Sequence, residues 1–136
     1  MSDQSELALR AIESFNQGGS EDFIRFLEAE AHPDFVFHIQ EDIPNGGEWK
    51  GIEGTRAMLR DWLETWDEFE VIPGEVVQGE GGRILINVEQ RAVSAGTGME
   101  LTGPFQYVWV VDDGRISEIH LFADPEQAKG VAGVGP

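Results

Sequence analysis

The apolar residues at the start of the chain follow the period of amphipathic helices. Residues 5–17 have the i, i+3, i+4, i+7 spacing of one buried face, formed by Ala8, Ala11, Ile12 and Phe15. Gly18-Gly19 is expected to end this helix, because glycine adopts the left-handed cap conformation without strain. Ser20 then predicts the N-cap of a second helix, and Pro33-Asp34 its end.

The pattern changes to a period of two after Pro33. Phe35, Phe37 and Ile39 alternate with less apolar positions, which predicts a half-buried strand. Residues 41–51 (EDIPNGGEWKG) are rich in acid, proline and glycine and predict a loop. Residues 53–66 return to the helical period, with one apolar stripe made of Met58, Leu59, Trp62, Leu63 and Trp66.

The rest of the chain predicts four strands joined by glycine-rich turns. They cover residues 70–80, with an interruption near Pro73-Gly74, and residues 83–93, 99–111 and 115–123. Asp124 is expected to cap a short last helix, and the tail 131–136 is expected to fray. Helices grouped first and hairpin-linked strands last predict one α+β domain over residues 1–136, with its core in 5–130 and an antiparallel sheet.

The charge restricts the partners of such a domain. The chain has 136 residues and a net charge of −17, from 26 acids against nine lysines and arginines. This field repels phosphate backbones and anionic lipid, so we expect neither nucleic-acid nor membrane binding. There is no cysteine, no long apolar run and no signal-peptide pattern, which favours a cytoplasmic protein.

Several local motifs occur in an order that resembles a known superfamily. They are the strand ending in Phe37-His38, the turn Trp49-Lys50-Gly51, the helix with Trp62 and Trp66, the hairpin Asp113-Gly114-Arg115-Ile116 and the Asp124 cap. Together they resemble the nuclear-transport-factor-2-like superfamily and, within it, the SnoaL-like proteins related to polyketide cyclases and ketosteroid isomerases. The resemblance covers about residues 5–130. It implies a cone-shaped, curved antiparallel sheet wrapped around the N-terminal helices, a pocket between them, and a homodimer formed through the outer sheet face.

The catalytic groups of these relatives are missing from the matching positions. The base carboxylate of ketosteroid isomerases would fall in residues 37–40 (FHIQ), and their oxyanion tyrosine near Ala11 or Ile12. Their protonated aspartate would fall near Gln106, and the aspartate of SnoaL-like cyclases near Leu121. The resemblance therefore implies a binding site but no single reaction, since this fold carries many functions.

The register of the last hairpin decides which residues face the pocket. A three-residue loop, Asp112-Asp113-Gly114, would place Tyr107 and Trp109 on the same face as Ile119 and Leu121, whereas a two-residue loop would place their neighbours there. We favour the three-residue loop, because its sequence suits a type I turn followed by a left-handed glycine.

Two residues are candidates for catalysis, and nine more for contact with an apolar substrate. His38 is the candidate acid or base, because histidine is the residue type suited to proton transfer near neutral pH. Tyr107 is the candidate hydrogen-bond donor to a carbonyl. Each also has a structural interpretation, as a surface histidine and as a core tyrosine. The residues expected to shape the pocket are Phe15, Phe37, Trp49, Met58, Trp62, Phe105, Trp109, Ile119 and Leu121.

No metal site or cofactor is expected. His32, His38 and His120 lack the spacing of metal ligands on one element, and no phosphate or dinucleotide motif is present. Glu89 and Arg91 are expected to form an exposed or interfacial ion pair. Three functions remain open: a SnoaL-like isomerase, cyclase or hydrolase acting on a small apolar molecule, a non-catalytic binder of such a molecule, and a protein-interaction module.

Overall fold

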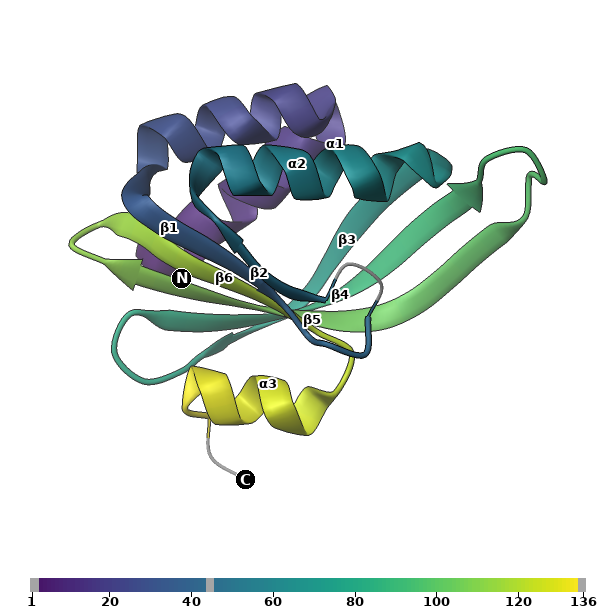
Figure 1. Cartoon of the computed structure of the whole chain (residues 1–136). Coiled ribbons are helices and arrows are strands. Elements are labelled where there is room, and N and C mark those ends of the chain that lie inside the picture. Colours follow the sequence, from purple (N-terminus) through teal and green to yellow (C-terminus); the bar gives the residue numbers. More distant parts are fainter. Residues whose placement is uncertain (1–2, 44–45, 135–136) are drawn as a thin grey trace.

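The computed structural model describes residues 3–43 and 46–134, which form three helices and one six-stranded sheet (Figure 1). The elements are α1 Asp3–Glu30, β1 Ala31–Ile39, β2 Gly47–Lys50, α2 Gly51–Glu64, β3 Trp66–Gln78, β4 Arg83–Ser94, β5 Glu100–Asp112, β6 Arg115–Phe122 and α3 Pro125–Ala132. None of the helices in these residues is long and apolar enough to cross a membrane.

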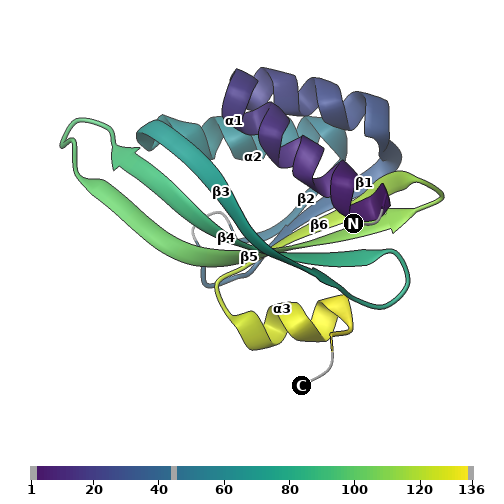
Figure 2. The same cartoon turned by 180° about the vertical axis from the view of Figure 1, so that it is seen from behind.

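The sheet is curved and has helices on both faces. Its strand order is β2-β1-β6-β5-β4-β3. α1 and α2 cover the concave face, called the inner face below, and α3 covers part of the opposite, outer face (Figures 1 and 2). This is the predicted α+β class, with one difference in the sheet: β1 and β6 run parallel, whereas every other pair is antiparallel.

The N-terminal segment follows the predicted glycine break. α1 is two helical pieces joined at Gly19, whose φ of 75° and ψ of −162° are not helical. Glycine is suited to this position because it has no Cβ to strain there. The break lets both pieces lay apolar residues on the inner face, including Ala11 and Leu27, each with no exposed surface.

Two segments differ from the sequence prediction. Gly47–Lys50, predicted as loop, forms the edge strand β2 and pairs with the end of β1. Trp66, predicted as the end of a helix, begins β3, since α2 already ends at Glu64. In both cases pairing with a neighbouring strand supplies backbone hydrogen bonds that the local sequence pattern does not reveal.

In the last hairpin the predicted loop length is wrong, but Tyr107 and Trp109 still lie on the predicted face of the sheet. The loop has two residues, Asp113 (φ 53°) and Gly114 (φ 75°), and Asp112 pairs with Arg115. A β-bulge then shifts the register: Val110 lies opposite Glu118 and Val111 opposite Ile116, which leaves Ser117 as the extra residue.

The bulge restores the predicted inner face. Beyond it, Trp109 lies opposite Ile119 and Tyr107 opposite Leu121. The Ser117 hydroxyl donates a 3.1 Å hydrogen bond to the Val110 carbonyl and stabilises the irregular step. Tyr107 and Trp109 therefore face the helices, although the loop that would have put them there directly does not form.

A second, smaller core lies on the outer face. Leu85, Val108 and Phe122 of the sheet pack against Ala128 and Ala132 of α3. As predicted, Asp124 caps this helix by accepting a 2.9 Å hydrogen bond from the Glu126 backbone N–H. Residues 131–134, predicted to fray, continue the helix and its glycine cap, while 135–136 lie outside the described residues. The homodimer through the outer face stays a prediction.

The docking of α3 generates the first testable prediction. A Cβ on Gly79 would lie 2.0 Å from the carbonyl oxygen of Ala132, whereas a Cβ on Gly130 would meet nothing within 4 Å. Gly79→Ala is therefore expected to reduce the free energy of unfolding by about 1–3 kcal/mol through overpacking, measured by urea unfolding. Gly130→Ala, at an exposed position of α3, is expected to be neutral or to stabilise by up to about 1 kcal/mol. Equal stability of the two variants would contradict this packing.

Candidate functional site

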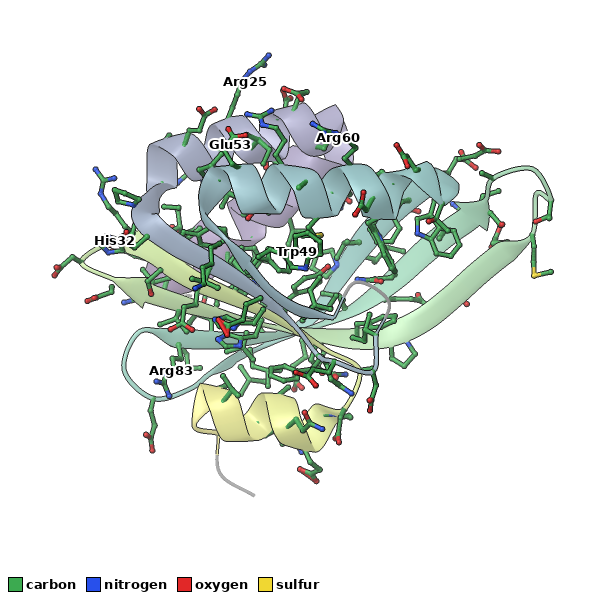
Figure 3. All side chains as sticks on the ribbon, in the orientation of Figure 1. Arg25, His32, Trp49, Glu53, Arg60 and Arg83 are labelled. Carbon is green, nitrogen blue, oxygen red and sulfur yellow. The ribbon has the colours of Figure 1, made fainter. Side chains whose placement is uncertain are left out.

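The main cavity lies between the inner face of the sheet and the two N-terminal helices. About 60 Å³ of it is open to the centre of a water molecule. Its walls are almost entirely apolar, and they are made by Ile12, Phe15, Phe23, Phe37, Ile39, Ile43, Met58, Leu59, Trp62, Phe69, Val71, Gln90, Tyr107, Trp109 and Leu121. Figure 3 shows the side chains that fill the space between α2 and the sheet.

Aromatic rings packed edge to face form the wall near the end of α2. Phe69 of β3 makes such contacts with Phe15, at 5.8 Å between ring centroids, and with Trp62, at 5.7 Å. Trp62 also contacts Trp66, again at 5.7 Å. These contacts join α1, α2 and β3, so the two N-terminal helices and the sheet share one aromatic cluster.

Tyr107 and Gln90 place a hydrogen-bonded polar pair within this apolar surface. The Gln90 side-chain amide donates a 3.0 Å hydrogen bond to the Tyr107 hydroxyl oxygen. The phenol's own proton has no acceptor among the described residues, so it is available to a ligand. Burial raises the pKa of Tyr107 far above that of an ordinary phenol, and the bond from Gln90 offsets only part of this increase. The hydroxyl is therefore a neutral donor at physiological pH.

Trp109 supplies a second donor. Its side chain is only 2% exposed, and its buried indole N–H has no hydrogen-bond partner in the part of the chain that the structure describes. Its ring centroid lies 6.2 Å from that of Tyr107, two residues earlier on the same face of β5. An unpaired buried N–H costs about 1–3 kcal/mol, which an acceptor on a bound molecule would recover.

The structure brings together most of the residues predicted to contact a substrate. Phe15, Phe37, Met58, Trp62, Trp109 and Leu121 line the cavity together with Tyr107. Trp49, Phe105 and Ile119 do not line it. Ile119 and Trp49 belong to the same core. Ile119 is fully buried and lies opposite Trp109 on the neighbouring strand, and Trp49, labelled in Figure 3, packs on the core from β2. Whether any of these residues binds a ligand stays a prediction.

His38 lies on the outer face, away from Tyr107. It follows Phe37 in β1, and successive strand residues point to opposite faces. Its ring stacks on that of His120, with centroids 4.2 Å apart and planes 6° apart. Burial lowers the pKa of His120, and the neighbouring His38 lowers it further. The two residues predicted to act together in catalysis are thus separated by the sheet.

Two other sequence interpretations change with the structure. Arg91 pairs with Glu70 at 3.2 Å and with Glu100 at 3.1 Å, instead of with Glu89. Gln90 was not among the predicted site residues. It continues the inner-face alternation of Ile84, Ile86 and Val88, so the sequence carried a usable signal for it. The lining residue Phe69 was missed because β3 begins at Trp66, earlier than its sequence pattern indicated. Val71 lies within the predicted strand, but it was not assigned to the pocket.

Comparison with known proteins agrees with this architecture. A family profile described as the SnoaL-like domain matches residues 8–119, so the chain belongs to the SnoaL-like domain family. Among curated proteins, none matches the sequence significantly.

Solved structures show the same fold over nearly the whole chain. A nuclear-transport-factor-2-like protein of unknown function from Burkholderia pseudomallei K96243 is 20% identical, with a TM-score of 0.78 and coverage of 97% of this chain and 98% of that one. TerC, co-crystallised with polyporic acid, is 19% identical, with a TM-score of 0.77 and coverage of 96% and 98%. A cystatin-fold protein from Novosphingobium aromaticivorans is 17% identical, with a TM-score of 0.67 and coverage of 90% and 98%.

The buried phenol gives a direct pH prediction. Tyr107 is the single tyrosine of the chain, so tyrosinate absorbance reports on it alone. We expect the unfolded chain in urea to ionise near pH 10 and the folded protein to stay un-ionised there. Because the folded-state pKa is the higher one, the stability that it contributes is complete below pH 10 and decreases as the pH rises above that value. Identical titration curves for folded and unfolded chain would contradict the buried position.

Proposed function

We propose that this protein binds a small, flat, largely apolar molecule that carries an oxygen acceptor. The observation that supports the proposal is the pair of donors, Tyr107 O–H and Trp109 N–H, in an otherwise apolar cavity. Apolar walls give affinity through burial, and a few polar groups give orientation. A carbonyl or ether oxygen is the group that both donors can satisfy.

The size of the cavity shapes the binding event. The 60 Å³ open to a water centre is room for a few water molecules. A ligand with two fused rings needs more space, so the lining must move. We expect Met58 and Trp62 of α2 to move, because methionine is flexible and Trp62 is only half-buried near the end of its helix.

The chemistry of the lining favours binding over acid–base catalysis. Among the described residues that line the cavity there is no aspartate, glutamate or histidine. Tyr107 can polarise a carbonyl as a neutral donor, but no lining carboxylate or imidazole is present to remove a proton. The proposal is therefore the non-catalytic form of the function, with isomerase, cyclase or hydrolase activity as the less supported alternative.

The relative TerC supports the chemical class. Its structure was obtained with polyporic acid. At 19% identity this likeness shows the shared fold, and the ligand belongs to TerC. It makes an aromatic carbonyl compound a reasonable first probe of the cavity here.

A matched pair of ligands tests the proposal. 2-Acetylnaphthalene carries a carbonyl oxygen, and 2-ethylnaphthalene has nearly the same shape without it. We expect wild-type protein to bind the acetyl compound more tightly in equilibrium dialysis, by about 1 kcal/mol or roughly fivefold in Kd for one hydrogen bond. Tyr107→Phe is expected to remove most of this preference while still binding the ethyl compound.

The control is Arg25→Ala, which changes an exposed side chain on α1 that points away from the molecule (Figure 3). It should keep both the affinity and the preference of the wild type. Loss of the preference in the control, or an unchanged preference in Tyr107→Phe, would show that the phenol does not orient the ligand. Failure of both compounds to bind would remove the basis of the proposal.

A further inference from the structure

Two histidines and a glutamate meet on the outer face of the sheet, where β1 and β6 run parallel. His38 is the register partner of His120, and Glu118 precedes His120 by two residues on the same face of β6. The sequence spacing gave no reason to expect a metal site, because this pairing joins two strands from opposite ends of the chain. The three side chains lie across the sheet from the apolar cavity and take no part in it.

The distances between their ligand atoms are already close to those between the ligands of one metal ion. One carboxylate oxygen of Glu118, Oε1, is 2.9 Å from Nε2 of His38 and 3.1 Å from Nε2 of His120. One ligand atom from each of the three residues lies within 4.8 Å of the others. In a tetrahedral zinc site with bonds of about 2.0–2.1 Å, ligand atoms are about 3.3 Å apart. The oxygen therefore already stands near the required distance from both nitrogens.

The orientation of the two imidazole rings must change before both can bind one ion. The two imidazoles stack almost parallel, so their in-plane lone pairs do not yet point to one position. Turning the rings about their Cβ–Cγ bonds brings both Nε2 atoms toward a common ion. A hollow with about 360 Å³ open to a water centre borders His38 and His120 and gives them room to turn.

A neighbouring carboxylate, that of Glu48, lies where it could support His38 as a metal ligand. Glu48 of β2 has an oxygen 3.9 Å from Nδ1 of His38, on the other side of the ring. When a metal takes Nε2, the imidazole carries its proton on Nδ1, and Glu48 can accept a hydrogen bond from it. Carboxylates placed behind a histidine in this way orient the ring and strengthen it as a ligand. A neutral imidazole binds the metal through one ring nitrogen and keeps its proton on the other, so no proton needs to leave the ring.

We propose that His38, Glu118 and His120 form a binding site for one divalent transition-metal ion, with zinc as the best match. Two imidazoles and one carboxylate are ligands that zinc accepts, and they leave its fourth position for water or a ligand atom in the adjacent hollow. The charge of −17 favours the approach of a cation. The site is independent of the function proposed for the cavity.

The test uses untagged, chelator-treated protein titrated with Zn²⁺ in a calorimeter and with Co²⁺ in a spectrophotometer. We expect one Zn²⁺ per chain, and Co²⁺ absorption bands of tetrahedral intensity. Removing a carboxylate behind a ligand costs about 10- to 100-fold in metal affinity, so removal of a ligand itself, in His120→Ala or Glu118→Gln, should cost at least about 100-fold. His32→Ala is the matched control, because it removes the remaining histidine, whose Nε2 contacts the Asp112 carbonyl elsewhere.

A second measurement on wild-type protein keeps the test decisive if a variant fails to fold. In the NMR spectrum, Zn²⁺ should shift the imidazole signals of His38 and His120 and leave those of His32 unchanged. Absence of zinc binding, equal affinity of wild type and His120→Ala, or shifts confined to His32 would each overturn the proposal. Binding of 2-acetylnaphthalene should be the same with and without Zn²⁺, which separates this test from that of the cavity.

Discussion

The parallel pairing of β1 with β6 is the contact on which both faces of the molecule depend. It joins the strand that leaves the N-terminal helices to the last strand of the sheet, with Phe37 opposite Ile119 and Ile39 opposite Leu121. The same register places His38 beside His120 on the other face. Because strand side chains alternate, a shift of one residue would exchange these faces and remove Phe37 and Ile39 from the cavity. The backbone hydrogen bonds between β1 and β6 therefore determine both which residues line the apolar cavity and which histidines meet on the outer face.

The cavity departs from the packing that stability alone would favour. Ordinary packing would fill it with side chains and would not bury a donor without a partner. The indole N–H of Trp109, however, is almost fully buried and has no partner among residues 3–43 and 46–134. Natural proteins retain such local costs where a site requires them. The hydrogen bond from Gln90 to Tyr107 holds the phenol in place and leaves the phenol proton for another acceptor. The fold builds the apolar walls, and these few polar atoms are the groups that the proposed ligand would contact.

The bulge at Ser117 shows how a correct face can follow from an incorrect loop. The sequence Asp112-Asp113-Gly114 suggested a three-residue connection, whereas the structure has a two-residue loop followed by one extra residue in β6. A three-residue loop would have left the extra residue on the β5 side, whereas the bulge leaves it in β6. The two registers therefore differ by two residues, and both put Tyr107 and Trp109 on the same face. Local turn preferences did not distinguish them, because the choice depends on how β6 packs against β1 as well as β5.

By itself, the sequence determined the order of the helices and of the strands other than β2, the α+β class and the break at Gly19. It also determined most of the aromatic residues in the cavity wall. These features follow from periodicity and glycine placement, which act over a few neighbouring residues. Only the tertiary structure decided the edge strand β2, the partners of Arg91, and the meeting of His38 with Glu118 and His120. These depend on pairing between segments far apart in the chain, and the local pattern of a strand does not state which neighbour it will have.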